Sequence, residues 1–325
     1  MFALIAFLAS FVIIPLYFKI AEKFNIIDKP NNRSSHTQIT IRGAGVVFPL
    51  MILAVWLFGN QMGLLPDLAE SYNLSKIQNV EFYLGLSIIA VISFWDDVKP
   101  LPPKIRMLVH AVAVSLITIP LGVDWWIVAI AMVLIIGTIN AYNFMDGING
   151  ITALYSLVAV GTALTMLGMG YELVLGESIW LTLGASLVAF SFFNVRKKAR
   201  CFMGDVGAVS LAFVLAYWIY GLVLSQENLI YILFLGVYGL DSVATIAIRI
   251  FKKENIFEAH RSHFYQYLAN EKAWPHVAVS SLYAAIQLVL NALILWQPLV
   301  GILSFVFLVL AYIKIRLPQL RSNPS

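Results

Sequence analysis

The segment Asn140-Ala-Tyr-Asn-Phe-Met-Asp-Gly-Ile-Asn-Gly150 lies between two long apolar runs, residues 125–139 and 151–168. It contains three amide side chains, one carboxylate and two glycines, and no Lys or Arg. Such a segment can hydrogen-bond a polar ligand and chelate a cation, and its glycines allow the backbone to approach closely. The alternative is a plain polar turn between two membrane spans, and the rest of the chain has to decide between the two interpretations.

The apolar runs on either side are typical of the whole chain. Of its 325 residues, 61% are hydrophobic and only 12% are charged, and the mean hydropathy is +0.86. Because soluble domains carry about 25% charged residues, this composition predicts a polytopic membrane protein. The single Cys201 excludes a disulfide within the chain. The apolar N-terminus lacks a basic n-region and a cleavage site, so we expect a retained first span.

Apolar stretches predict an all-α integral membrane bundle of about eleven transmembrane helices, forming one domain over residues 1–325. The stretches are roughly Phe2–Phe18, Ala44–Gly59, Phe82–Trp95, Met107–Leu121, Trp125–Ile139, Ile151–Gly168, Ser178–Phe193, Val206–Leu224, Leu229–Ile248, Val277–Trp296 and Leu299–Ile313. No internal repeat is evident, which argues against a secondary transporter.

The basic residues are distributed unevenly between the two sides of this bundle. All of the 21 Lys and Arg residues except Lys76 follow odd-numbered stretches. Because cytoplasmic loops are enriched in Lys and Arg, the N-terminus is predicted outside and the C-terminus in the cytoplasm. We therefore expect the active site in the cytoplasmic loops, residues 21–43, 96–106, 140–150, 194–207 and 249–276.

Adjacent carboxylates, Asp96 and Asp97, end the third stretch. Two neighbouring acids at a membrane edge are unfavourable, because each raises the pKa of the other near a low-dielectric medium. A bound divalent cation would offset the repulsion, and a carboxylate beside it could accept a proton or orient a phosphate. The alternative is a polar helix C-terminus, although the helix dipole favours cations there.

Three further segments place polar groups on the same side. Arg42 precedes the glycines that open the second stretch, and such a helix start suits an anion, with a basic membrane anchor as the alternative. The spacing of Asn140, Asn143 and Asp146 predicts a polar stripe on one helix face. Asp205 lies in Gly204-Asp205-Val-Gly207 at the start of the eighth stretch, either as an ordinary N-cap or as a fourth carboxylate of the site.

The ninth stretch and the loop after it carry the remaining candidates. Asp241 lies inside the predicted span, and an intramembrane carboxylate is by default a hypothesis for a functional site, whose role the sequence leaves open. The following loop contains His260, Arg261 and His263. No Cys partner and no H-E-x-x-H spacing supports zinc, so these residues suit a pyrophosphate or a nucleotide better.

These five segments together resemble the polyprenyl-phosphate N-acetylhexosaminyl-1-phosphate transferase family of the glycosyltransferase 4 type, over nearly the whole chain. The family includes the bacterial phospho-MurNAc-pentapeptide transferase and the sugar-phosphate transferases that start O-antigen and related polymers. Its acidic pair is matched by Asp96-Asp97, its Asn-x-x-Asn-x-x-Asp-Gly motif begins at Asn140, and its Gly-Asp-x-Gly motif begins at Gly204.

The resemblance implies transfer of an N-acetylhexosamine 1-phosphate from a UDP-sugar to undecaprenyl phosphate, with release of UMP and with Mg²⁺, or Mn²⁺ in its place. It implies that Asp96 and Asp97 are catalytic and ligate the metal together with Asp205. The substrate-binding residues would be Arg42, Lys104, Asn140, Asn143, Asp146, His260, Arg261 and His263. The expected location is the bacterial inner membrane with the site facing the cytoplasm. The expected partners are the two substrates, membrane lipid and a second copy in a homodimer, and not nucleic acid.

The sequence departs from the family pattern at several positions. His260-Arg-Ser-His263 replaces the longer histidine runs of other members and resembles the branch that initiates O-antigen or related surface polysaccharide. Pro100 stands where some relatives carry a third acid, and Ile39, Ile41 and Ala44 stand where relatives often have Pro, Pro and Gly. The alternatives are a lipid-linked-sugar flippase or transporter, a phospho-MurNAc-pentapeptide transferase, a phosphatidyl-type alcohol transferase and a noncatalytic scaffold. The sugar, the oligomeric state and the choice between direct attack and a covalent intermediate stay open.

Overall fold

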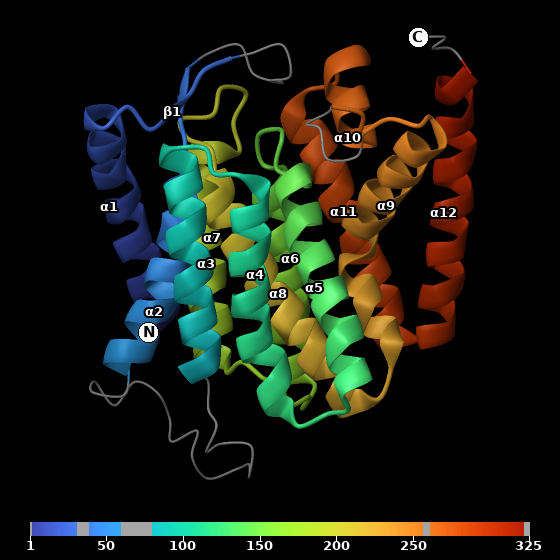
Figure 1. The fold of residues 1–325 in the computed structure, drawn as a ribbon, viewed down its shortest axis with the longest axis horizontal. Coiled ribbons are helices and arrows are strands. Elements are labelled where there is room, and N and C mark those ends of the chain that lie inside the picture. The colour runs from blue at the N-terminus through green and yellow to red at the C-terminus, as the bar shows by residue number, and fades with distance from the viewer. Residues whose placement is uncertain (1, 31–38, 60–79, 256–260, 322–325) are drawn as a thin grey trace.

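The computed structural model of this chain describes residues 2–30, 39–59, 80–255 and 261–321. Over these ranges the chain forms a bundle of long helices whose axes run side by side (Figure 1). The long helices are α1 (Phe2–Lys23), α2 (Val47–Gly59), α3 (Val80–Val98), α4 (Pro103–Thr118), α5 (Trp125–Met145), α6 (Ile151–Gly168), α7 (Glu177–Asn194), α8 (Gly204–Gln226), α9 (Gly236–Phe251), α11 (His276–Trp296) and α12 (Pro298–Arg321). The short ones are η1 (Ala44–Val46), η3 (Ile119–Leu121), η4 (Leu229–Leu235), α10 (Phe264–Gln266) and the π-helix η5 (Tyr267–Glu271).

Every apolar stretch predicted from the sequence coincides with one of these long helices, with η1 leading into α2 and η4 into α9. Eight helical segments among the described residues are long and apolar enough to cross a membrane, and residues 44–58 form a shorter apolar helix. The prediction of an all-α integral membrane fold is therefore confirmed in its class. The total of about eleven spans and the orientation stay predictions.

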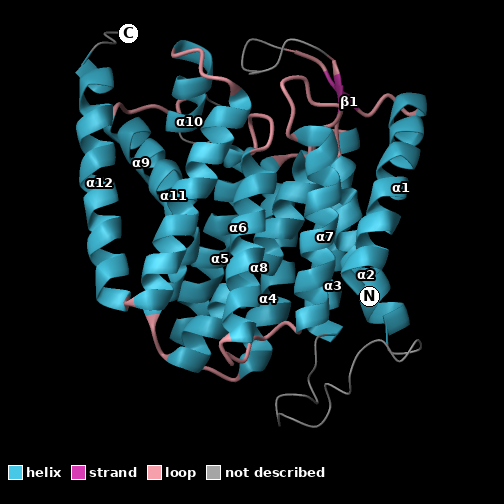
Figure 2. Ribbon diagram, turned by 180° about the vertical axis from the view of Figure 1, so that it is seen from behind, coloured by secondary structure: helices cyan, strands magenta, loops and turns pink. Residues whose placement is uncertain are grey.

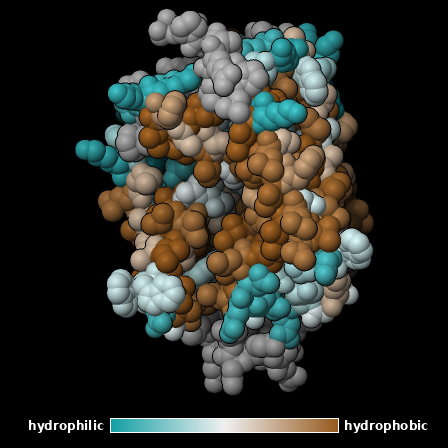
Figure 3. All heavy atoms as spheres, turned by 90° about the vertical axis from the view of Figure 1, so that its right-hand side faces the viewer, coloured by the Kyte–Doolittle hydropathy of each residue, from teal (hydrophilic) through white to brown (hydrophobic). Residues whose placement is uncertain are grey.

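One side of the bundle is hydrophobic in its middle and hydrophilic at both ends. Figure 3 shows this pattern on the side that carries α9 and α12. Large apolar side chains of α12 are exposed there, among them Phe307 at 70% and Leu310 at 62%. An apolar belt of this kind suits the hydrocarbon core of a bilayer, in which exposed apolar side chains meet lipid tails.

Helix α8 forms the centre of the bundle, and α1 and α12 lie on opposite outer sides (Figure 2). Every residue of α8 from Gly204 to Leu222 is buried. Helices α3 and α5 pack directly against it, and α1 packs against α7. A helix that is apolar all round belongs in an interior, so α8 provides a fixed core against which the ends of the other helices are placed.

A short two-stranded sheet in the first loop departs from the purely helical prediction. Strand β1 (Ile27–Asp28) pairs antiparallel with β2 (Thr40–Ile41). The backbone of Ile41 also accepts a hydrogen bond of 2.7 Å from the N–H of Phe202, and the N–H of Ala44 donates to the carbonyl of Phe202 at 3.1 Å. Strands of two residues are too short to show an alternating pattern in the sequence. Their effect is to fix the start of α2 beside the start of α8.

Two glycines allow these two helix starts to touch through their backbones. A Cβ atom added to Gly207 would lie 2.8 Å from the Cα of Gly45, and one added to Gly45 would lie 2.5 Å from the Cα of Gly207. Neither position accepts a side chain without separating η1 from α8. This close approach brings the Arg42–Gly43 turn against the first turn of α8.

Candidate active site

Asp205, in the first turn of α8, is the carboxylate on which the polar residues of three other segments converge. Its Oδ1 accepts a hydrogen bond of 2.7 Å from Nη2 of Arg42. Its Oδ2 accepts from Nη1 of Arg106 at 3.3 Å and from Nδ2 of Asn143 at 3.4 Å. The first loop, α4 and α5 therefore all meet α8 at this one side chain. The site can form only when these elements are packed together.

Asp97 joins the end of α3 to the start of α8. Its Oδ1 accepts hydrogen bonds from Nε of Arg42 at 2.6 Å and from the N–H of Asp205 at 2.9 Å, and its Oδ2 accepts from the N–H of Val206 at 3.0 Å. The first N–H groups of a helix have no partner within the helix and attract a negative charge. The Asp97 side chain has no exposed surface. Its geometry is therefore that of a capping carboxylate that holds α3, Arg42 and α8 together.

Asp96 points to a different partner from its neighbour. Its Oδ2 accepts a hydrogen bond of 2.7 Å from Nη1 of Arg106, and its Oδ1 accepts from the N–H of Leu101 at 2.5 Å. Its side chain is 7% exposed, whereas that of Asp205 is 13% exposed. The two adjacent acids are thus separated in space and compensated by different arginines, so guanidinium groups already offset the repulsion that the sequence assigned to a cation.

Arg106 is a site residue that the sequence analysis missed. It bridges Asp96 and Asp205, whereas Lys104, which was predicted to bind substrate, is exposed on α4 and has no hydrogen bond or ion pair with the described residues. Residues two positions apart lie on different faces of a helix, so only one of the two can face the site. The two prolines before Lys104 mark the start of α4 in the sequence, but they do not say which face of the helix meets α8.

The asparagines of α5 lie beside this cluster, as expected from the predicted polar stripe on one helix face. Asn143 reaches Asp205, and Asn140 donates to the carbonyl of Ile136 at 2.8 Å. The stripe does not continue to Asp146, because α5 ends at Met145 and Asp146 is the C-cap residue with a φ of −83° and a ψ of 58°. That part of the predicted stripe is wrong, since the helix ends before the third residue of the pattern.

Asp146 is nevertheless placed in the electrostatic field of the site. The pKa of its carboxyl group is raised to about 7, chiefly by burial and also by the charge of Asp205, while a hydrogen bond with Thr152 and the charge of Arg42 oppose this rise. Burial alone would lower the pKa of the Arg42 guanidinium, but Asp205 and Asp97 raise it above its ordinary value. Arg42 therefore stays charged at any physiological pH, whereas Asp146 changes its charge near neutrality.

A small cavity of about 10 Å³ lies among Arg106, His110, Asn140, Asn143 and Asp205. Its size is that of a single water molecule. His110 is a second residue that sequence reasoning missed. It is 5% exposed and lies one turn after Arg106 on α4. It falls within a predicted apolar span, where nothing in the sequence separates a site residue from a core histidine.

The histidine-containing loop is only partly described. His260 lies outside the described residues, Arg261 is exposed, and His263 is 1% exposed. The Nδ1 atom of His263 lies 3.6 Å from Oδ1 of Asp241. The loop reaches the segment after α5 through Tyr265, whose hydroxyl donates to the carbonyl of Phe144 at 2.9 Å. His263 thus faces the interior of the bundle rather than a ligand at the surface.

The cluster does not have the arrangement of a ready magnesium site. Its carboxylates are the hard oxygen donors that Mg²⁺ prefers. However, Arg42 and Arg106 bridge these carboxylates in pairs. Among the described residues, no group of three or more His, Cys, Asp or Glu side chains is placed to hold a metal ion. Metal ligation by Asp96, Asp97 and Asp205 therefore stays a prediction, and it requires the arginines to move.

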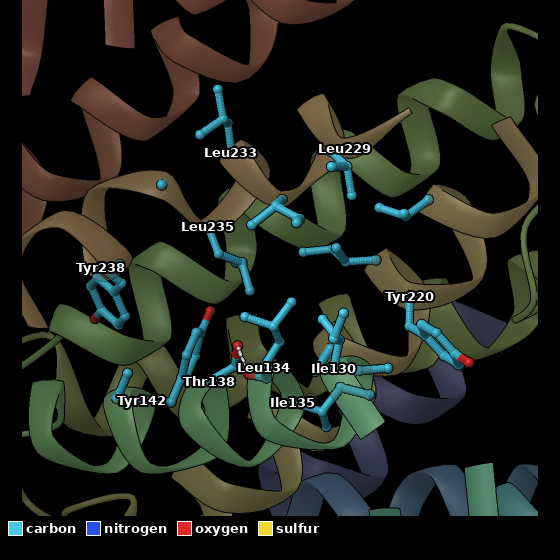
Figure 4. Close-up of a pocket in the computed structure, with 18 of the residues that line it drawn as sticks. Ile130, Leu134, Ile135, Thr138, Tyr142, Tyr220, Leu229, Leu233, Leu235 and Tyr238 are labelled. Carbon is cyan, nitrogen blue, oxygen red and sulfur yellow. Dashed lines mark hydrogen bonds between the residues drawn. The ribbon is translucent and has the colours of Figure 1, made fainter. Parts of the chain in front are cut away.

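An apolar groove of about 290 Å³ opens on the other side of α5. Figure 4 shows Ile130, Leu134 and Tyr142 of α5 facing Leu233, Leu235 and Tyr238 across it. It is also lined by Ala216, Ile219, Tyr220, Val223 and Leu224 of α8. Helices α5, α8 and α9 and the 3-10 helix η4 therefore form its walls.

Comparison with known proteins finds similarity that covers most of this cluster. Residues 80–223 match the model of a family described as Glycosyl transferase family 4. That range contains Asp96, Asp97, Arg106, Asn143 and Asp205. A probable undecaprenyl-phosphate N-acetylglucosaminyl 1-phosphate transferase of Bacillus subtilis (strain 168) is 27% identical over 285 residues, which are 82% of this chain and 75% of the relative.

Two further relatives carry another name. A phospho-N-acetylmuramoyl-pentapeptide-transferase of Thermotoga neapolitana is 28% identical over 49% of this chain and 52% of the relative. One from Streptococcus thermophilus (strain CNRZ 1066) is 30% identical over 53% of this chain and 47% of the relative. The chain thus spans about half the length of these two proteins, and their similarity is to part of the bundle.

Proposed function

Since this chain belongs to glycosyl transferase family 4, we propose that it transfers an N-acetylhexosamine 1-phosphate from a UDP-sugar to undecaprenyl phosphate. The products are undecaprenyl-pyrophosphoryl-sugar and UMP. The observation that carries the proposal is the meeting of three carboxylates, two arginines and an asparagine at the ends of membrane helices. A reaction between a water-soluble nucleotide and a phosphate on a lipid needs a charged site at the ends of membrane helices, where the membrane meets water.

The chemistry joins two anionic substrates. An oxygen of the lipid phosphate attacks the sugar-linked phosphorus of the UDP-sugar, a new P–O bond forms, and the bond to UMP breaks. Because negative charges must approach one another, positioning and charge neutralisation dominate such a reaction. Arg42 and Arg106 are the groups for this task, since each already binds two carboxylates and can exchange one of them for phosphate oxygens.

The two adjacent acids have different tasks in this proposal. Asp96 binds the proton of the lipid phosphate or orients that phosphate, because its side chain, unlike that of Asp97, keeps a small exposed surface and its guanidinium partner is shared with Asp205. Asp97 positions Arg42 and the start of α8, because its side chain has no exposed surface and both of its oxygens accept backbone N–H groups. Asn143 and Asp146 lie where the nucleotide would bind.

The apolar groove between α5, α8, η4 and α9 supports a lipid substrate. It shares α5 with the polar cluster, since Tyr142 lines the groove and the next residue, Asn143, bonds Asp205. A prenyl chain in the groove would keep its phosphate at the end of the bundle where the arginines lie.

The proposed setting is the bacterial inner membrane, with the site facing the cytoplasm. The proposed assembly is a homodimer.

The test follows UMP release by purified protein from UDP-GlcNAc, with undecaprenyl phosphate and Mg²⁺ present. We expect Asp96→Asn, Asp97→Asn and Asp205→Asn each to abolish release. Lys104→Ala, at an exposed position on the same side, is the matched control and should retain most of the activity. Full activity in all three aspartate variants would contradict the assignment of the site, and lipid-sugar flipping without UMP release would favour a transporter.

The relatives named phospho-N-acetylmuramoyl-pentapeptide-transferase support a second candidate substrate. Parallel assays with UDP-GlcNAc, other UDP-N-acetylhexosamines and UDP-MurNAc-pentapeptide distinguish the two. Turnover of the pentapeptide substrate alone would place the enzyme in peptidoglycan synthesis. Turnover of the simple sugars would support the first membrane step of O-antigen or other surface polysaccharide. Removal of Mg²⁺ with a chelator in the same assay tests the metal requirement.

A further inference from the structure

We propose that Asp241 is a positioning residue that fixes residues 262–271 and, through Tyr265, the Phe144–Gly147 turn at the edge of the candidate site. The inference rests on the proposed function, because it assigns that turn to the binding of the UDP-sugar. Asp241 lies within α9 and is 1% exposed. An ionisable group buried in a membrane bundle requires compensating partners, and the identity of these partners indicates its task.

Two partners of Asp241 are backbone groups of the loop. Its Oδ1 accepts a hydrogen bond of 2.9 Å from the N–H of Phe264, and its Oδ2 accepts one of 3.2 Å from the N–H of Tyr265. These N–H groups belong to the first turn of α10, where a helix has unpaired donors. The carboxylate therefore fixes the backbone of the loop directly, rather than a side chain at its surface.

Three hydroxyl groups of the bundle also contact the carboxylate, together with Nδ1 of His263, which lies 3.6 Å from its Oδ1. Oδ2 accepts from the Tyr283 hydroxyl of α11 at 2.6 Å. Oδ1 accepts from the Tyr312 hydroxyl of α12 at 3.0 Å and from the Thr245 hydroxyl at 3.2 Å. Asp241 thus joins α9, α11 and α12 to the loop. Hydrogen bonds to a charged acceptor are stronger than those between neutral groups, so these bonds hold the loop firmly against α9, α11 and α12.

Tyr265 carries this placement toward the candidate site. Its side chain is fully buried, and its hydroxyl donates to the carbonyl of Phe144 at 2.9 Å. Its ring also fills the space beside Gly147, where an added Cβ would lie 3.1 Å from the Cζ of Tyr265. Phe144 directly follows Asn143, and Gly147 directly follows Asp146. A shift of Tyr265 would therefore move the turn that presents these two side chains to Asp205 and to the nucleotide.

Two tyrosine variants separate positioning from simple stabilisation. Tyr265→Phe and Tyr312→Phe each remove one hydroxyl that donates one hydrogen bond. Only the bond from Tyr265 reaches the Phe144–Gly147 turn, whereas the bond from Tyr312 ends on Asp241. If the network only stabilises the fold, the two changes should have equal effects on every measurement. If it positions the turn, the binding of the UDP-sugar should respond to Tyr265→Phe alone.

The first measurement is the Kd of UDP-GlcNAc for the full-length protein in detergent. We expect Tyr265→Phe to raise the Kd about three- to tenfold, the effect of losing one neutral hydrogen bond at the turn. Tyr312→Phe, which loses a hydrogen bond away from the turn, should change the Kd less than about twofold. Equal shifts in the two variants, or an unchanged Kd for Tyr265→Phe, would overturn the inference.

The second measurement is amide hydrogen exchange in the ligand-free protein. We expect Asp241→Asn to accelerate exchange in residues 261–275 and also in residues 140–150, and Tyr265→Phe to do so in residues 140–150. Unchanged exchange of residues 140–150 in both variants would overturn the inference. If the wild-type protein binds neither UDP-GlcNAc nor another UDP-sugar, it is the proposed function that fails. The positioning role of Asp241 is then decided by the hydrogen-exchange measurement by itself.

Discussion

Replacing Gly207 by alanine should weaken the fold and the candidate site at the same time. The added Cβ would lie 2.8 Å from the Cα of Gly45 and still closer to the side chain of Met203. The methionine can rotate away, but the backbone of Gly45 cannot. The contact is relieved only if η1 and the Arg42–Gly43 turn move away from α8.

The structure sets the size of the effect. Overpacking of a close contact costs about 1–3 kcal/mol, and the better helix propensity of alanine returns at most about 1 kcal/mol. The net loss, up to about 2 kcal/mol, should lower the midpoint of thermal unfolding by up to roughly 8 °C. Because Arg42 bridges Asp97 and Asp205 at 2.6 and 2.7 Å, the displacement should also reduce UMP release on the order of 100-fold.

The matched control is Gly161→Ala in α6, where an added Cβ meets nothing within 4 Å. It should leave activity unchanged and leave the unfolding midpoint equal or slightly higher. Both variants can be compared in detergent by thermal unfolding and by UMP release. A Gly207→Ala protein as stable and as active as Gly161→Ala would refute the argument that backbone contact between η1 and α8 positions Arg42.

Further expectations concern charge. Burial raises the pKa of Asp146 to about 7, so the folded state holds this proton more tightly than the unfolded chain and loses stability as pH rises from about 4 to about 7. Asp146→Asn should remove that loss, and identical pH profiles of unfolding in wild type and variant would contradict it. Arg42→Ala should tighten Mn²⁺ binding measured by titration, because it frees two carboxylates from a competing cation, and weaker binding would show that Arg42 supports the metal. Arg106→Ala should reduce UMP release far more than Lys104→Ala, since only Arg106 contacts Asp96 and Asp205, and equal losses would argue against the observed helical phase of α4. Arg261→Ala should raise the KM for the UDP-sugar without lowering the unfolding midpoint, and an unchanged KM would count against a substrate role for this exposed residue.

Several conclusions from local pattern agree with the structure. The apolar stretches coincide with the long helices, because a run of apolar residues has few ways to avoid water other than burial or lipid. Asn143 and Asp205 meet as expected, because both lie at helix ends on the same side of the bundle. Asp146 left the predicted stripe because a helical period holds only as far as the helix extends, and α5 ends one residue earlier.

The partners of each charged group followed from the fold and not from the sequence. Composition and spacing indicate that the acids and arginines share one end of the bundle. This shared end can be read from the sequence because it depends only on the order of the spans and on the positive charge of the loops. Only the packing of α3, α4 and the first loop against α8 selects Arg106 over Lys104 and turns Asp97 into a cap of α8.

The Asn140–Gly150 segment shows the same division. Its residue types determined that it could bind a polar ligand. Its place beside Asp205 and its support from Tyr265 and Asp241 were decided by tertiary contacts. Asn143 and Asp205 are 62 positions apart in the sequence, and Phe144 and Tyr265 are 121 positions apart. Such contacts depend on the register in which helices pack, and a single helix carries no information about that register.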